Sequence, residues 1–80
     1  MLKSIMVIKM LYKRIKELRK EKGITQVNVS TNIGVEESYY GKYERGVHDI
    51  PLSVLIKLAD FYNVSLDYIT ERTNKREINK

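Results

Sequence analysis

The sequence predicts an all-α fold of five short helices in one small domain. Residues that commonly begin or end helices divide the chain into short segments: Gly23, Gly34, Gly46, Pro51 and Asn63. Within most of these segments, apolar residues recur three or four positions apart, which is the spacing of one helix face. A chain of 80 residues has room for one hydrophobic core, so the helices are expected to pack around it.

The first helix is expected over residues 11–22. Leu11, Ile15 and Leu18 fall at positions i, i+4 and i+7 and form one apolar stripe. Gly23 follows directly and suits a left-handed C-terminal cap. This pattern predicts a helix that buries one face and ends before Gly23.

The segment at residues 26–32 admits two interpretations. Thr25 is a suitable N-cap for a helix that begins at Gln26. Between positions 27 and 35, however, valine, threonine and isoleucine recur at every second position, which is typical of a β-strand. The pattern alone leaves helix and strand open.

A third helix is predicted over residues 36–45. Glu36 and Glu37 stand in its first turn, where carboxylates complement the positive end of the helix macrodipole. Tyr40 and Tyr43 lie three positions apart and therefore share a face. Gly46 marks the end of this helix.

Two further helices are predicted in the C-terminal half. The fourth begins near Pro51, a residue that is tolerated in the first turn. Its apolar stripe comprises Leu55, Leu58, Ala59 and Tyr62. Ser65 is a suitable N-cap for a last short helix that contains Leu66 and Ile69. From residue 73 onward the chain is polar, and this tail is expected to fray.

Composition and charge exclude several classes of protein. The chain has no cysteine and one histidine, the loop residue His48, so it offers neither a thiolate metal site nor a Ser-His-Asp triad. We therefore expect no enzyme activity, metal, cofactor or small-molecule substrate. The apolar run at residues 5–8 is far shorter than the roughly 20 residues of a membrane span, and a cytoplasmic protein is expected. The net charge of +5 suggests a polyanionic partner.

Four blocks in a fixed order carry a family resemblance. They read IKELRKEKGITQ (residues 15–26), IGV (33–35), KYERG (42–46) and LADFYNVSLDY (58–68). Together they resemble the Xre-like, phage-repressor type of helix-turn-helix transcriptional regulators over about residues 11–69. The resemblance implies a compact five-helix, lambda-repressor-like DNA-binding domain over residues 11–70. Residues 1–10 are then an N-terminal extension, and residues 71–80 are a polar C-terminal tail.

The resemblance also implies which residues meet DNA. It favours a helix at residues 26–32 and makes residues 36–45 the recognition helix, whose first turn faces base edges in the major groove. The residues at DNA-contacting positions are Gln26, Glu36, Glu37, Ser38, Tyr39, Lys42 and Arg45. Further phosphate contacts are expected from Lys13, Arg14 and Thr25. Arg19 and Glu44 match a family pair that forms a structural salt bridge, and Tyr40 occupies a core position.

The function that the resemblance implies is a sequence-specific, double-stranded-DNA-binding transcriptional regulator that represses by occupying its operator. Such regulators often bind as homodimers, because a two-fold protein matches a pseudo-palindromic site. Phe61, Tyr68 and Ile69 lie near the fourth and fifth helices, and more apolar surface there than a monomer needs would suit a dimer interface, but the sequence leaves that interface open.

One feature departs from the family pattern. No Lys or Arg stands between Ile24 and Gly41, so the start of the predicted recognition helix is acidic. Since phosphate neutralisation supplies most non-specific affinity for DNA, this favours an alternative: a protein-interaction module of antitoxin or anti-repressor type with weak or no DNA binding. Glu37 either accepts a hydrogen bond from a cytosine amino group or only complements the helix macrodipole.

Overall fold

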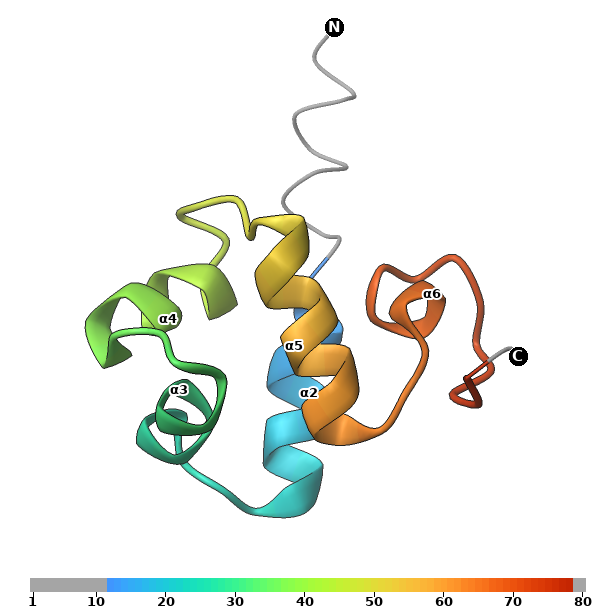
Figure 1. The fold of residues 1–80 in the computed structure, drawn as a ribbon, viewed down its shortest axis with the longest axis horizontal. Coiled ribbons are helices and arrows are strands. Elements are labelled where there is room, and N and C mark those ends of the chain that lie inside the picture. Colours follow the sequence, from blue (N-terminus) through green and yellow to red (C-terminus); the bar gives the residue numbers. More distant parts are fainter. Residues whose placement is uncertain (1–11, 79–80) are drawn as a thin grey trace, which may run out of the picture.

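The computed structural model describes residues 12–78 and places five helices in them (Figure 1). They are α2 (Lys13–Lys22), α3 (Gln26–Ile33), α4 (Glu37–Glu44), α5 (Leu52–Tyr62) and α6 (Leu66–Ile69). None of the described residues lies in a strand, so the all-α prediction is confirmed and the strand interpretation of residues 26–32 is wrong. The predicted extension at residues 1–10 lies outside the described residues.

Local capping explains why residues 26–33 are helical. At the start of α3, Thr25 Oγ1 accepts a hydrogen bond from the backbone N–H of Asn28. Gly34 ends α3 with a φ of 75°, and Gly23 ends α2 with a φ of 69°. This left-handed conformation is readily available to glycine only. Both ends of α3 are therefore satisfied, whereas the described chain offers no neighbouring strand that an extended segment could join.

The predicted boundaries of the third and fourth helices shift by one residue. Glu36 and Arg45 are the two caps of α4, so the predicted helix at residues 36–45 corresponds to α4 with its caps. Pro51 is the N-cap of α5 and has an extended backbone, with a ψ of 151°, rather than forming part of the first turn.

The helices between residues 12 and 78 are too short or too polar to span a membrane.

One fully buried side chain from each helix meets in the core. These side chains are Ile15 of α2, Val29 of α3, Tyr40 of α4, Leu58 of α5 and Ile69 of α6. Figure 1 shows α3 and α4 together on one side of α5, with α6 on the other side. Because α3 and α4 each insert buried side chains into this common core, their relative orientation is fixed.

Tyr68 and Ile69, which the sequence left open as possible dimer-interface residues, both belong to the core. Tyr68 is 9% exposed and Ile69 is 0% exposed. Phe61 is partly buried and packs against the core, with its ring edge-on to that of Tyr62. The apolar side chains that reach the surface of α5 are instead Leu52 and Ile56.

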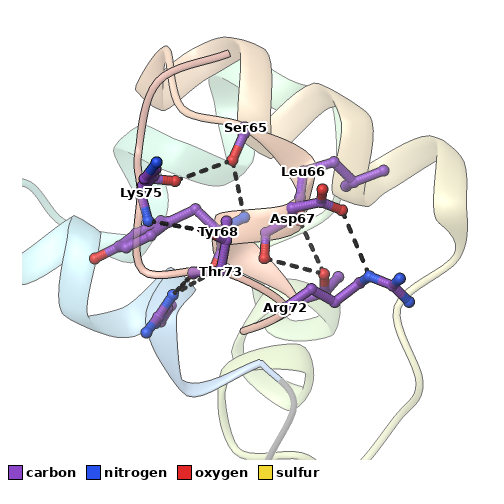
Figure 2. Close-up of polar contacts among 9 residues, drawn as sticks. Ser65, Leu66, Asp67, Tyr68, Arg72, Thr73 and Lys75 are labelled. Atoms are coloured by element: carbon purple, nitrogen blue, oxygen red, sulfur yellow. Dashed lines mark hydrogen bonds and ion pairs between the residues drawn. The ribbon is translucent and has the colours of Figure 1, made fainter. Parts of the chain in front are cut away.

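The prediction that the chain frays beyond residue 73 is also wrong for the described residues. The chain after α6 folds back, as Figure 2 shows, and residues 73–78 are called the C-terminal clasp below. Ser65 N donates to Arg76 O at 2.8 Å, and Ser65 Oγ donates to Lys75 O at 3.3 Å. From α2, Arg14 Nη1 donates to Thr73 O at 2.7 Å.

An arginine of the clasp forms a second connection to α2. Arg76 donates two hydrogen bonds of 2.9 Å to the carboxylate of Glu21, and these bonds lower the pKa of Glu21. The Tyr68 ring lies near two guanidinium groups, at 4.2 Å from the Arg14 Cζ and 5.1 Å from the Arg76 Cζ. The clasp thus ties α2 to α6 on the side of the fold away from α4 (Figure 1).

Candidate nucleic-acid interface

The start of α4 projects outward from the helical body. Residues 36–39 are all exposed, and the next residue, Tyr40, is fully buried. Tyr40 and the 4% exposed Tyr43 hold the inner face of α4 in the core, so the opposite face is available to a partner. Four of the predicted DNA-contacting residues lie on this exposed first part: Glu36, Glu37, Ser38 and Tyr39.

Glu36 caps α4 with its own side chain. Its Oε1 accepts a hydrogen bond of 3.2 Å from the backbone N–H of Tyr39 and another from the Ser38 hydroxyl. These hydrogen bonds, that of Ser38 first, hold the pKa of Glu36 below its ordinary value. The Glu36 carboxylate therefore serves as the N-cap of α4. The Glu37 carboxylate is exposed and does not cap the helix.

Tyr39 is the centre of an exposed aromatic cluster. Its side chain is 45% exposed and packs edge-on against Tyr43, with ring centroids 5.3 Å apart. The imidazole of His48 stacks on Tyr39 at 5.1 Å with an interplanar angle of 19°. One turn along α4, Lys42 Nζ lies 5.9 Å from the Tyr39 ring centroid. The sequence favours a loop residue over a pH-sensing residue at His48, and no local pattern indicates that the loop brings His48 back onto Tyr39.

Gln26 and Arg45 meet over Gly41. A β-carbon built at Gly41 would lie 3.3 Å from both Arg45 Nη1 and Gln26 Oε1. The missing side chain of Gly41 therefore leaves room for the first residue of α3 and the C-cap of α4 to approach one surface of α4. Gln26 is held there by a hydrogen bond of 3.1 Å from its Nε2 to Glu44 Oε1.

The ion pair expected from the resemblance is present between α2 and α4. Arg19 Nε and Nη2 donate to the two oxygens of Glu44 at 2.8 and 3.1 Å, and Arg19 Nη1 donates to Ile24 O at 3.0 Å. The Glu44 side chain is 1% exposed. Burial acts to raise the pKa of Glu44, but hydrogen bonds led by that of Arg19 outweigh burial, so the pKa lies below its ordinary value.

The three predicted phosphate contacts are divided between two places. Thr25 caps α3 next to Gln26 and is exposed. Lys13 is exposed but lies 3.9 Å from Glu71 Oε1. Arg14 donates to Tyr68 O at 2.8 Å and also contacts the C-terminal clasp, so its guanidinium makes structural hydrogen bonds. The hydrogen-bond partners of its guanidinium are distant in sequence and come near it only when the chain folds.

Within residues 12–78 there is no cluster of His, Asp or Glu side chains suited to hold a metal ion. The exposed side chains of α3 and α4 instead present hydroxyl, amide, carboxylate, phenol and cationic groups. Such groups form hydrogen bonds to base edges and phosphates. The arrangement can recognise a polar surface.

Comparison with known proteins gives consistent matches. The family model described as "Helix-turn-helix" matches residues 15–69. The uncharacterized HTH-type transcriptional regulator YobD of Bacillus subtilis is 39% identical over 61 residues, which cover 76% of this chain and 54% of YobD. The chain spans about half the length of the first curated relatives it matches.

Two solved structures have the same fold. The restriction-modification controller protein C.AhdI of Aeromonas hydrophila is 30% identical, with a TM-score of 0.70, covering 79% of this chain and 94% of C.AhdI. The N-terminal DNA-binding domain of SinR from Bacillus subtilis is 31% identical, with a TM-score of 0.69, covering 76% of this chain and 90% of that domain. Both likenesses extend over most of the described residues.

Proposed function

The chain belongs to the helix-turn-helix family, and on that premise we propose that it is a sequence-specific, double-stranded-DNA-binding transcriptional regulator. The observation that carries this proposal is the exposed start of α4, residues 36–39, held outward by the buried Tyr40 and Tyr43. A helix presented in this way fits the major groove, which is about 12 Å wide. In the helix-turn-helix docking geometry, its N-terminal residues reach the base edges.

The side chains divide into two roles in this proposal. Ser38, Tyr39 and Lys42 read base edges from successive turns of the exposed face of α4. Gln26 and Arg45, which meet over Gly41, contact phosphates on one side of the groove. Thr25 and Lys13 add phosphate contacts from the starts of α3 and α2, whereas Arg14 takes no part.

The charge of the surface favours selective rather than tight binding. The Glu37 carboxylate stands in the first turn, close to where phosphates would lie, and repulsion there lowers non-specific affinity in a salt-dependent way. A carboxylate at a base edge also accepts a hydrogen bond from a cytosine amino group. Glu37 therefore contributes specificity at the expense of general affinity.

We propose that the regulator acts as a repressor and as a homodimer. Leu52 and Ile56, one turn apart on α5, are 62% and 44% exposed. Ile56 lines a hollow of about 290 Å³ together with Leu66 and the 45% exposed Ile78, and Asp60 and Asp67 also line it. A second copy would cover the exposed apolar side chains. Two recognition helices would then meet half-sites about 34–36 Å apart. Sedimentation equilibrium tests this: a monomer at all concentrations contradicts it.

The remaining parts of the proposal follow from a role on DNA. We propose that the protein acts in the cytoplasm and works by occupancy rather than catalysis. It requires no cofactor, metal, membrane or small-molecule substrate for that action. A polymerase that cannot reach an occupied site would explain repression.

The alternative, a protein-interaction module of antitoxin or anti-repressor type, loses part of its support. It rested on the acidic start of the recognition helix, and Glu36 is explained as the N-cap of α4. A stable complex with a protein, together with no retained DNA in the same preparation, would favour this alternative.

Fluorescence anisotropy tests the proposed function. A labelled duplex from the region that flanks the protein's own gene is titrated at 50–100 mM salt, on the order of the conditions where phosphate contacts dominate. Replacing Lys42 by Ala is expected to weaken binding by about 1–3 kcal/mol if Lys42 reads a base. Lys57→Ala, on the exposed side of α5, is the matched control and should bind like the parent protein. Absence of saturable binding by the parent protein contradicts the proposal.

A further inference from the structure

We infer that His48 is a further DNA-contacting residue whose protonation strengthens binding, so that affinity for DNA rises as pH falls from 8 to 6. This inference rests on the proposed function and adds to it a residue and a dependence on pH. It starts from the stacking of His48 on Tyr39, which places an imidazole beside a residue proposed to read bases.

The loop after α4 folds back along that helix and carries His48 to this place. Gly46 adopts a φ of 73°, and Gly46 N donates to Tyr43 O at 3.1 Å. Val47 N then donates to Lys42 O at 2.9 Å. These contacts reverse the chain, so His48 is held on the exposed side of α4 by backbone hydrogen bonds and by the stack. Both rings of the stack belong to exposed residues.

The charges around the stack leave one position for a switchable cation. Between Gly46 and Ile56 the chain has no Lys or Arg, and the first turn of α5 carries no charged residue. In the same loop, Asp49 follows His48 directly. The charged residues of α4 and its caps are Glu36, Glu37, Lys42, Glu44 and Arg45. Of these, Glu44 is paired with Arg19, and Lys42 lies against the Tyr39 ring.

Histidine is the side chain suited to act between pH 6 and 8. An imidazole ordinarily titrates near pH 6.5, whereas carboxylates and lysines ordinarily titrate well outside this range. His48 is the one histidine of the chain, so a pH effect in this range can be assigned to it by substitution. A phosphate beside the ring favours the charged form, and an imidazolium also lies favourably over the face of a tyrosine.

The expected size of the pH effect on DNA affinity follows from counterion release. One added phosphate contact changes the slope of log affinity against log salt by about 0.9, which corresponds to about eightfold in affinity at 0.1 M salt. An ordinary imidazole is only partly protonated at pH 6. The expected gain between pH 8 and pH 6 is therefore smaller, at about fivefold.

The test measures anisotropy of the labelled flanking duplex at pH 6, 7 and 8 in 0.1 M salt. The parent protein should bind about five times more tightly at pH 6 than at pH 8. His48→Gln should abolish most of this dependence, and His48→Arg should bind at pH 8 about as well as the parent does at pH 6. Circular dichroism at each pH checks that all three proteins are folded.

The outcomes separate this inference from the proposed function. Saturable binding whose pH dependence is the same for the parent and His48→Gln overturns the role of His48 and leaves the proposed function standing. Equal loss of affinity at every pH in His48→Gln assigns the residue to holding Tyr39 and also overturns its role as a titrating contact. Absence of binding by every variant overturns both statements together.

Discussion

Replacing Glu44 by Gln tests how α4 is held against α2. Glu44 is the point where Arg19 and Gln26 converge, with donor–acceptor distances of 2.8 Å from Arg19 Nε and 3.1 Å from Gln26 Nε2. The substitution keeps the shape of the side chain and removes its charge. The Arg19 guanidinium, whose side chain is 14% exposed, is then left without its carboxylate partner.

The expected loss of stability is large for a domain of this size. Removing one partner of a buried ion pair costs about 3–5 kcal/mol. A chain of 80 residues is ordinarily stable by about 4–12 kcal/mol. For a small domain, each kcal/mol lowers the unfolding temperature by about 4–8 °C. The Glu44→Gln variant should therefore unfold at least about 12 °C below the parent protein.

Thermal unfolding followed by circular dichroism measures this shift. The matched control is Glu17→Gln, an exposed carboxylate on α2, which should change the free energy of unfolding by no more than about 0.5 kcal/mol. Combining Glu44→Leu with Arg19→Met should cost less than either change alone, because no unpaired charge remains. A loss of under about 1 kcal/mol in Glu44→Gln would refute the reasoning, since the pair would then behave like one on the surface.

The same carboxylate predicts the acid dependence of stability. The folded-state pKa of Glu44 lies below its ordinary value, so the folded protein binds a proton there less readily than the unfolded chain does. Its contribution to the free energy of unfolding is full above the ordinary carboxyl pKa, near 4.3, and is lost as pH falls through the lowered pKa. Urea unfolding between pH 2 and 7 should show a shallower acid limb in Glu44→Gln.

Three further predictions concern α4 and the C-terminal clasp. Glu37→Gln should strengthen binding to an unrelated duplex and steepen the salt slope by up to about 0.9, and an unchanged slope would place this carboxylate away from DNA. Gly41→Ala should retain or raise thermal stability, since alanine is favoured in helices by about 1 kcal/mol. It should nevertheless weaken DNA binding in anisotropy titrations, because the new β-carbon crowds the two side chains 3.3 Å away, and equal affinity would refute their proposed role. Arg76→Ala should speed amide hydrogen exchange at Ser65, whereas Lys75→Ala should not, and equal protection in both would contradict the clasp.

The sequence predicted the features that depend on neighbouring residues. Helix-ending glycines and side-chain caps act within one turn. The structure has the glycines at positions 23 and 34 and the caps Thr25 and Ser65 at helix ends. The apolar stripe of the fourth helix likewise became the buried face of α5. Local steric and hydrogen-bonding preferences are sufficient for these predictions. Residues 26–32 are ambiguous from sequence because β-branched alternation competes with a good N-cap.

Features that depend on distant pairing could not be predicted in the same way. Arg14 and Tyr68 are 54 positions apart, and the clasp joins polar residues whose pattern is that of a fraying tail. Nothing in the spacing of Tyr39 and His48 indicates that the loop returns along α4. Similarly, sequence shows that Glu36 can favour a helix start, but only the three-dimensional arrangement shows its carboxylate accepting the Ser38 hydroxyl and Tyr39 amide.

Selection of bound sequences from a random duplex library tests the central claim most directly, namely that the outward face of α4 reads base pairs. The parent protein is predicted to enrich one short sequence, repeated in inverted orientation if two copies bind together. The Lys42→Ala protein is predicted to enrich the same sequence with the preference relaxed at one position in each half. Recovery of sequences indistinguishable from the starting library would contradict the claim.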